Sequence, residues 1–190
     1  MKKTKFNISL INSNKTKKLN IRYKWTGTGK DMLFGLVYLK KKYKDVCLPL
    51  LSFFSSDLML DTSIRYECVL NKKQSEANHK NYKLYFPTNN SNKKNESNSK
   101  DFIKKLKYCR YNKKRFSLIP IYLMLNSCDY SEAHFNYIIF DNKKNIVERF
   151  DPYGVYNYES FETFLWFDKD FKTLLKNNKL NMTYITPKQT

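Results

Sequence analysis

Two short apolar segments joined by a polar loop constrain the fold of this chain more than any other feature. The segments are residues 134–140 and 146–150, and the loop between them, residues 141–145, has the sequence Asp-Asn-Lys-Lys-Asn. Segments of this length that are rich in β-branched and aromatic residues are typical of a β-hairpin. The hairpin opens on His134, and Asp151 follows its second strand, so strand pairing is expected to bring these two side chains together at one end of the sheet.

The residues on either side of the hairpin predict an α+β arrangement. Helical spacing of apolar residues predicts helices over 101–114 and 158–176, and Asp101 is a suitable N-cap for the first. The segment 116–125 is apolar on both faces, which is typical of a strand in the centre of a sheet. With a last short strand over 181–186, the order becomes α-β-β-β-α-β. We therefore expect a mostly antiparallel sheet packed by helices.

Composition divides the chain into three parts. Residues 1–70 contain predicted short strands and a helix over 31–44, and form an uncharacterised N-terminal α+β part. Residues 71–101 are rich in Asn, Lys and Ser, which is typical of an exposed, partly disordered insertion or linker. His79 lies in this insertion and is expected to be a solvated loop residue. Residues 102–190 contain the hairpin and form the third part.

Basic residues dominate the charge of the chain. Lys and Arg number 36 against 17 Asp and Glu, which gives a formal net charge of +19. The lysines are spread along the whole chain, and together with abundant Asn, Tyr and Phe they indicate AT-rich coding and a solvated surface. The same charge also suits a polyanion, because Lys and Arg release counterions from phosphates. Both interpretations stand, and weak non-specific binding to nucleic acid is expected at low salt.

The cysteine and histidine spacings give no sign of a metal or cofactor site. The four cysteines at 47, 68, 109 and 128 form no Cys-x-x-Cys pair, and the two histidines complete no zinc spacing. The sequence therefore predicts reduced thiols in a cytosol-like compartment, with no metal and no cofactor. No stretch approaches the roughly 18 apolar residues of a membrane span, and the interrupted apolar run 6–11 is not that of a signal peptide.

Four segments of the C-terminal part carry a family resemblance. They are the apolar strand 116–123, His134-Phe135-Asn136, the string Glu148-Arg149-Phe150-Asp151-Pro152-Tyr153-Gly154, and Tyr184-Ile185-Thr186-Pro187. Together, residues 119–190 resemble the Ulp1-like family of cysteine peptidases (the SUMO and adenovirus proteases), in the versions encoded by large DNA viruses. In that family a histidine begins one strand and its acidic partner ends the next. His134 and Asp151 match those two positions.

The resemblance implies a papain-like fold and nucleophilic attack on a polypeptide, such as a viral polyprotein or a ubiquitin-like conjugate. His134 would take the proton of a cysteine thiol and later protonate the leaving amine. Asp151 would accept the other ring N–H and fix the tautomer. Gln189 lies near the position of the oxyanion-hole glutamine of the family, after which the nucleophilic cysteine follows. In this sequence only Thr190 follows Gln189.

No cysteine of the sequence follows Asp151, so the nucleophile is not at the position that the family gives it. Cys128 lies six residues before His134, which is poor geometry, and Cys47 has only the chain order of papain in its favour. We therefore expect a cysteine-peptidase-like protein that is viral and cytoplasmic, in the host cell, a virus factory or a virion. As it stands, it is expected to be an inactive pseudoenzyme or a truncated product.

Two alternatives compete with this hypothesis. A histidine at the end of a hairpin that bonds an aspartate on the next strand is also compatible with a purely structural polar contact. The basic, aromatic-rich composition is compatible with a non-enzymatic module that binds nucleic acid or a viral partner protein. Binding that survives physiological salt would favour the second of these alternatives.

Overall fold

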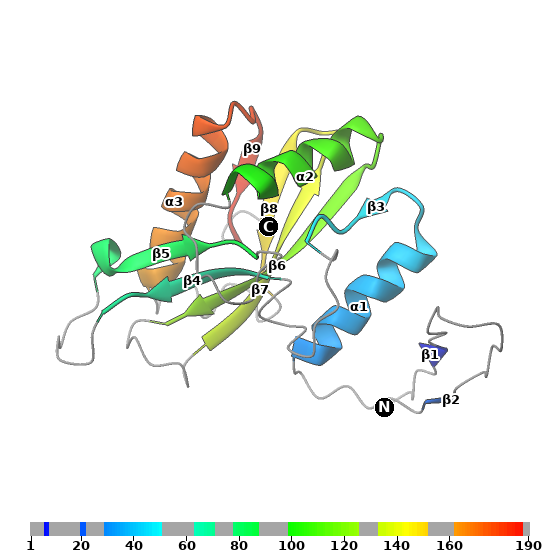
Figure 1. Ribbon diagram of the computed structural model, residues 1–190, viewed down its shortest axis with the longest axis horizontal. Coiled ribbons are helices and arrows are strands. Elements are labelled where there is room, and N and C mark those ends of the chain that lie inside the picture. The colour runs from blue at the N-terminus through cyan, green and yellow to red at the C-terminus, as the bar shows by residue number, and fades with distance from the viewer. Residues whose placement is uncertain are drawn as a thin grey trace.

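The computed structural model of the chain describes residues 6–7, 20–21, 29–50, 63–70, 78–87, 99–125, 133–151 and 162–187. Helices and strands follow one another along these residues, as labelled in Figure 1, and their bounds are β1 (Phe6–Asn7), β2 (Asn20–Ile21), α1 (Gly29–Lys42), β3 (Val46–Cys47), β4 (Ile64–Cys68), the 3₁₀ turn η1 (His79–Asn81), β5 (Tyr82–Tyr85), α2 (Ser99–Tyr111), β6 (Phe116–Met124), β7 (Ala133–Asp141), β8 (Ile146–Phe150), α3 (Glu162–Asn177) and β9 (Thr183–Ile185). The predicted α+β class is confirmed, and the order α-β-β-β-α-β from α2 onward is as expected.

The main sheet has seven strands in the order β5-β4-β6-β7-β8-β9, with β3 also paired to β6. The pairs β4–β5, β6–β7 and β7–β8 are antiparallel, whereas β3–β6, β4–β6 and β8–β9 are parallel. The sheet is therefore mixed, and the prediction of a mostly antiparallel sheet needs this correction. The physical reason lies in the connections, because parallel neighbours need a long crossover. Helix α3 supplies such a crossover between β8 and β9.

The predicted hairpin and the predicted central strand are both present. Strand β6 pairs with β7 over its full length, from Phe116 opposite Asp141 to Met124 opposite Ala133, and has β4 on its other side. Strands β7 and β8 pair from Asp141 opposite Ile146 to Tyr137 opposite Phe150. Asn145 closes the turn between them with a positive φ of 56°, which Asn tolerates better than most residues.

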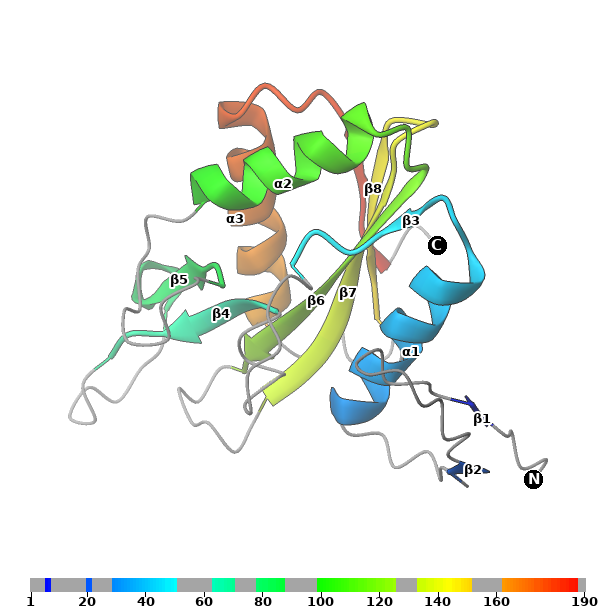
Figure 2. The same cartoon turned by 45° about the vertical axis from the view of Figure 1, so that its right-hand side comes forward.

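Helices pack on both faces of this sheet. Helices α2 and α3 lie together on one face and α1 lies on the other (Figures 1 and 2). Alternation along β6 separates the two cores, since Ile119 joins the large core under α2 and α3, whereas Leu118 packs against the small cluster of α1. The apolar stripe of α2, predicted from its spacing, is buried as expected and comprises Phe102, Ile103, Leu106 and Cys109.

The segment predicted to be a flexible insertion contributes to this core. Residues 82–85 form β5, which pairs with β4, and the side chains of Tyr82 and Phe86 are buried. The physical reason is that the large aromatic side chains of this apolar island find apolar partners, since Tyr82 packs on Trp166 of α3 and Phe86 stacks on Phe102 of α2. The seven-stranded sheet accordingly takes strands from all three predicted parts of the chain.

The prediction of reduced thiols is wrong. Cys47 on β3 and Cys109 on α2 form a disulfide, although 62 positions separate them in the sequence. Cys68 is disulfide-bonded as well, and no free cysteine occurs among the residues that the structure describes. Cys128 lies outside those residues. Spacing cannot reveal such a bridge, because the fold alone brings the two cysteines together. Bridges of this kind are rare in a reducing cytosol, so the expected cytosol-like compartment loses this support.

Asp141 stabilises the hairpin turn through charge-assisted hydrogen bonds. Its Oδ1 accepts the backbone N–H groups of Lys143 (3.0 Å) and Lys144 (3.1 Å), and its Oδ2 lies 3.2 Å from Nη2 of Arg115. Burial by itself raises the pKa of Asp141, but the Lys144 amide and the Arg115 guanidinium outweigh it and hold that pKa below its ordinary value. A depressed carboxyl pKa stabilises the fold above the unfolded-state pKa, and this contribution is lost as pH falls through the folded-state value.

We expect Asp141→Asn to lower the free energy of unfolding at pH 7 by about 1–2 kcal/mol, because the charged acceptor is lost. The difference between the variant and the wild type should shrink toward zero as the pH falls into the acid range, since the wild-type carboxyl then protonates. Urea unfolding curves at a series of pH values measure both effects. Asp101→Asn, at an exposed ion pair with Lys105, is the control and should change stability by less than about 0.5 kcal/mol.

No helix in the described part of the chain combines the length and the apolar character that crossing a membrane requires.

Candidate catalytic pair

The hairpin brings His134 and Asp151 into contact, as the sequence predicts. His134 lies near the start of β7, and Asp151 directly follows β8, whose pairing with β7 extends to Tyr137 opposite Phe150. The imidazole Nε2 lies 3.0 Å from both carboxylate oxygens of Asp151. The Asp151 side chain is fully buried, and 11% of the His134 side chain is exposed. The carboxylate is therefore fixed inside the protein, with the imidazole between it and the surface.

The contact assigns roles to the two ring nitrogens of His134. An ionised carboxylate only accepts hydrogen bonds, so the hydrogen in this contact belongs to Nε2 of the imidazole. In the neutral ring the lone pair then lies on Nδ1, the nitrogen that does not face Asp151. This arrangement suits a general base, because the carboxylate holds one nitrogen and stabilises the imidazolium that forms when the other takes a proton.

Asp151 belongs to a buried network centred on Arg149. Arg149 is fully buried, and its Nη1 lies 4.0 Å from Oδ2 of Asp151. The same Nη1 donates to Oδ1 of Asn136 at 2.6 Å. On its other side the guanidinium binds Asp168 of α3, with Nε to Oδ1 at 2.8 Å and Nη2 to Oδ2 at 3.3 Å. Tyr184 of β9 also donates to Oδ1 of Asp168, at 2.6 Å.

Charges of opposite sign alternate along this network, from Asp151 through Arg149 to Asp168. Buried charges are tolerated only when they are paired and hydrogen-bonded, and each of these three has a partner of opposite sign. Arg149 therefore acts as a positioning residue that joins the end of the hairpin to α3. It fixes the place of Asp151 and, through it, the orientation of the imidazole.

Phe164 of α3 forms one wall of the site. Its ring centroid lies 5.4 Å from that of His134, and Cζ of Arg149 lies 5.2 Å from the same ring. Phe164 is completely buried. A cation over an aromatic face is attracted to the ring, so the Phe164 ring packs against both the imidazole of His134 and the guanidinium of Arg149.

The network around Arg149 was not predicted from the sequence. A signal was present, because Val147, Arg149 and Asp151 alternate, which places the arginine on the same inward side of the strand as a buried valine. An arginine at an inward position needs a counter-charge. Asp168 could not be identified as that counter-charge, since it lies 19 residues away on an amphipathic helix.

The nucleophile is not found among the described residues. Cys47, which papain-like chain order favours, is bonded to Cys109, so the interpretation of Cys47 as a nucleophile is wrong for the oxidised chain. Gln189 and Cys128 lie outside the described residues. Within the parts of the chain that the structure describes, no cluster of His, Cys, Asp and Glu side chains has the arrangement of a metal site.

A second histidine–aspartate pair links the predicted insertion to α3. Nε2 of His79 lies 2.9 Å from Oδ1 of Asp170, and the hydroxyl of Tyr66 donates to Oδ2 of Asp170 at 2.7 Å. The His79 ring stacks on Trp166, with centroids 5.9 Å apart. The prediction of a solvated loop histidine is therefore wrong. Burial and the hydrogen bond to Asp170 both raise the pKa of Tyr66, so its hydroxyl stays protonated and serves as a donor.

The two pairs differ in burial. Both partners of the His79 pair are about 30% exposed, whereas the Asp151 carboxylate is fully buried and lies beside Arg149. We take the His79–Asp170 pair as a structural contact at the surface and the His134–Asp151 pair as the candidate catalytic pair. A buried carboxylate that is fixed in place orients an imidazole more strictly than a mobile, exposed one does.

No family model matches this chain, and neither a curated protein nor a solved structure shows significant similarity to it.

Proposed function

We propose that the chain is a Ulp1-like cysteine-peptidase relative in which His134 and Asp151 form the acid–base half of the catalytic site. The observation that carries the proposal is the contact of Nε2 with both oxygens of a fully buried Asp151. It is the orientation that a base working through Nδ1 needs. The substrate class that the resemblance implies is a polypeptide or a ubiquitin-like conjugate, and the protein is proposed to be viral.

Each residue has a defined part in this proposal. Nδ1 of His134 accepts the proton of a thiol, and the resulting imidazolium is stabilised by Asp151. The same imidazolium then returns the proton to the leaving amine. Arg149 and Phe164 hold the pair in place. The thiol itself is not among the described residues, all of whose cysteines are oxidised, so the oxidised 190-residue chain is proposed to hydrolyse no peptide.

The orientation of the imidazole gives a direct test, because the chain contains only two histidines. In a chain with ¹⁵N-labelled histidine, we expect the neutral His134 ring to carry its hydrogen on Nε2. Asp151→Asn should redistribute the hydrogen between the two nitrogens, since an amide does not select one tautomer as a carboxylate does. Spectra of His134→Ala and His79→Ala assign the two rings. A His134 tautomer that is unchanged in Asp151→Asn would contradict the proposal.

The activity part is tested with a peptide-based electrophile that labels catalytic cysteines. We expect no labelling of the oxidised chain. His79→Ala is the matched control for His134→Ala, because it removes the other histidine that contacts an aspartate, the one in the surface pair with Asp170. Labelling of the wild type that His134→Ala abolishes and His79→Ala preserves would show that a catalytic thiol is present after all.

A further inference from the structure

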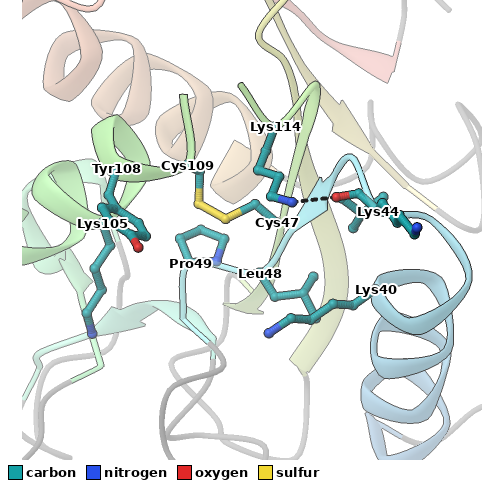
Figure 3. A pocket seen from close by; sticks show the side chains of 10 residues that line it. Lys40, Lys44, Cys47, Leu48, Pro49, Lys105, Tyr108, Cys109 and Lys114 are labelled. Atoms are coloured by element: carbon teal, nitrogen blue, oxygen red, sulfur yellow. Dashed lines mark hydrogen bonds between the residues drawn. A yellow bond between two sulfur atoms is a disulfide. The ribbon is translucent and has the colours of Figure 1, made fainter. Parts of the chain in front are cut away.

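A basic pocket lies between the C-terminal end of α1 and helix α2. It has a volume of about 630 Å³ and is lined by four lysines: Lys40 in the last turn of α1, Lys44 just after that helix, Lys105 in α2 and Lys114 just after α2. None of the described residues that line it is acidic. A volume in this range is typical of small-molecule sites. The Cys47–Cys109 disulfide forms part of its wall (Figure 3).

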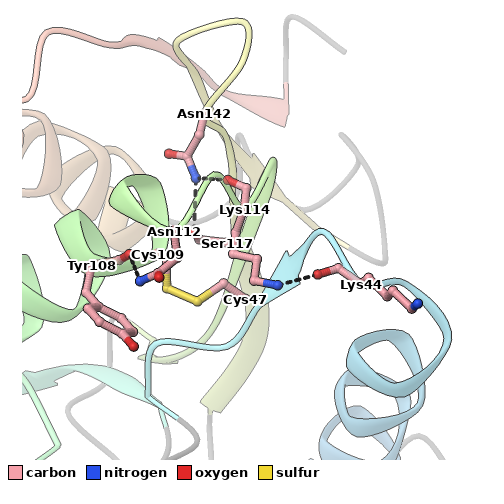
Figure 4. The surroundings of a disulfide bond; sticks show 8 residues. All are labelled: Lys44, Cys47, Tyr108, Cys109, Asn112, Lys114, Ser117 and Asn142. Carbon is pink, nitrogen blue, oxygen red and sulfur yellow. Dashed lines mark hydrogen bonds between the residues drawn. A yellow bond between two sulfur atoms is a disulfide. The ribbon is translucent and has the colours of Figure 1, made fainter.

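Of the four lysines, Lys114 places its ammonium group beside the disulfide, whereas the side chains of Lys40, Lys44 and Lys105 extend away from it (Figure 3). Nζ of Lys114 donates to the backbone oxygen of Lys44 at 2.6 Å, a neutral partner that does not cancel its charge. The backbone N–H of Lys114 also donates to the oxygen of Cys109 at 3.1 Å, which holds this residue beside the bridge (Figure 4). Lys105 is paired with Asp101, with 3.2 Å between Nζ and Oδ2. The positive charge next to the disulfide therefore comes from Lys114, and Lys40 and Lys44 add positive charge at a greater distance from it.

The two cysteine residues differ in exposure. Cys109 is 1% exposed and belongs to the buried stripe of α2, whereas Cys47 lies on the short strand β3 and is partly exposed. We therefore take the sulfur of Cys47, the more exposed residue, as the atom that a nucleophile in the pocket would attack. Displacement there puts negative charge on the sulfur of Cys109, whose backbone oxygen accepts the Lys114 N–H and which lines the same pocket as Lys114.

We infer that this pocket is a thiol–disulfide exchange site for small anionic thiols. The negative group of the ligand would bind the lysines, and its thiolate would attack Sγ of Cys47. The bond between the two protein sulfurs breaks, a mixed disulfide forms on Cys47, and the electron pair leaves on Cys109, whose thiolate takes a proton from solvent. A second thiol then attacks the mixed disulfide. In total, two small-molecule thiols are oxidised to one small disulfide, and the Cys47–Cys109 disulfide is reduced to two cysteine thiols.

Positive charge favours this reaction at two points. It raises the local concentration of an anionic reactant, an effect that reaches about 10–10³-fold in rate when charges line a cleft. It also stabilises the departing thiolate, since cationic neighbours favour the charged form of a cysteine. A cationic thiol gains only the second effect and is repelled on entry. The pocket is thus expected to react faster with anionic than with cationic thiols. An exposed disulfide without charged neighbours would show no such preference.

The test measures the reduction of the Cys47–Cys109 bridge by three thiols. They share a two-carbon chain and differ in the group at its end: 2-mercaptoethanesulfonate (anionic), 2-mercaptoethanol (neutral) and cysteamine (cationic). Alkylation and peptide mapping follow the bridge, and each rate is divided by that of the same thiol with a neutral model disulfide. We expect the anionic thiol to exceed the neutral one by about tenfold at low ionic strength. The advantage should largely vanish in 1 M salt, where the screening length is about 3 Å.

Lysine variants locate the effect. Lys40→Gln/Lys114→Gln should bring the normalised rates of the three thiols to within about twofold of one another, and Lys40→Arg/Lys114→Arg should preserve the selectivity. The matched control Lys80→Gln/Lys176→Gln removes the same net charge from η1 and α3 and should leave the selectivity unchanged. The Cys68 bridge, mapped in the same samples, is the internal reference and should show no preference for the anionic thiol.

Three results would overturn the inference. The first is equal normalised rates for the three thiols in the wild type at low salt. The second is the same anionic preference at the Cys68 bridge, which would reflect only the overall charge of +19. The third is a rate independent of thiol concentration, which would show that exchange follows unfolding of the chain rather than binding to the folded pocket.

Discussion

Arg149→Met is expected to lower the free energy of unfolding by about 3–5 kcal/mol, the cost of breaking a buried ion pair by removing one partner. The substitution leaves the Asp168 carboxylate and the Asn136 amide oxygen buried without the guanidinium that binds both. Urea unfolding followed by tryptophan fluorescence measures the loss. Arg110→Met is the matched control, because Arg110 is exposed and its guanidinium bonds only Asn145 among the contacts we describe. It should cost less than about 0.5 kcal/mol.

A second substitution separates the cost of an unpaired charge from the loss of the arginine side chain. Arg149→Met/Asp168→Leu removes both charges, and replacement of a buried pair by apolar groups is often close to neutral. We expect the double variant to recover more than half of the stability that the single variant loses. A double variant that is as unstable as the sum of the two single variants would contradict the role of Arg149 and Asp168 as a buried pair.

Removal of the Cys47–Cys109 bridge should have an effect of similar size. Cys47→Ser/Cys109→Ser removes a cross-link over 62 positions, for which loop-closure entropy gives about 4 kcal/mol. Denaturation of the oxidised wild type and of the double variant measures the loss. Replacement of both cysteines avoids the new free thiol that a single substitution would leave.

The bridge also predicts where the loss appears. Helix α1 and strand β3 contribute the small cluster of Leu36, Val46 and Leu48, whereas most buried residues of β6 and β7 belong to the large core. Without the bridge, amide hydrogen exchange should increase more in α1 and β3 than in β6 and β7, because few apolar contacts hold the first two elements. A uniform increase over all four elements would show that the bridge stabilises the fold as a whole.

Patterns within one segment predicted the elements well. The buried face of α2 follows from the spacing of its apolar residues, and the strands on either side of the turn at 141–145 follow from alternation and loop length. The contact between His134 and Asp151 was predictable for the same reason, since a hairpin places its two ends together. These predictions need only the chemistry of neighbouring residues along the chain.

Interactions between distant segments were not predictable in this way. The parallel pairs β3–β6 and β4–β6, the cross-link of Cys47 to Cys109 and the partnership of Arg149 with Asp168 each join residues from different elements. No periodicity within one segment encodes which other segment it meets. His134 and Asp151 could therefore be predicted from the sequence, whereas the residues that hold them in place, Arg149 and Asp168, could be identified only from the folded structure.

The Cys47–Cys109 bridge has a topological consequence for the molecule. It closes a covalent ring of residues 47–109, and β4 and β5 of the main sheet both lie within this ring. Cleavage of any single peptide bond inside the ring opens the backbone but leaves the two fragments covalently joined. In its oxidised form the protein can therefore exist as a two-chain molecule in which both fragments still contribute strands to one sheet.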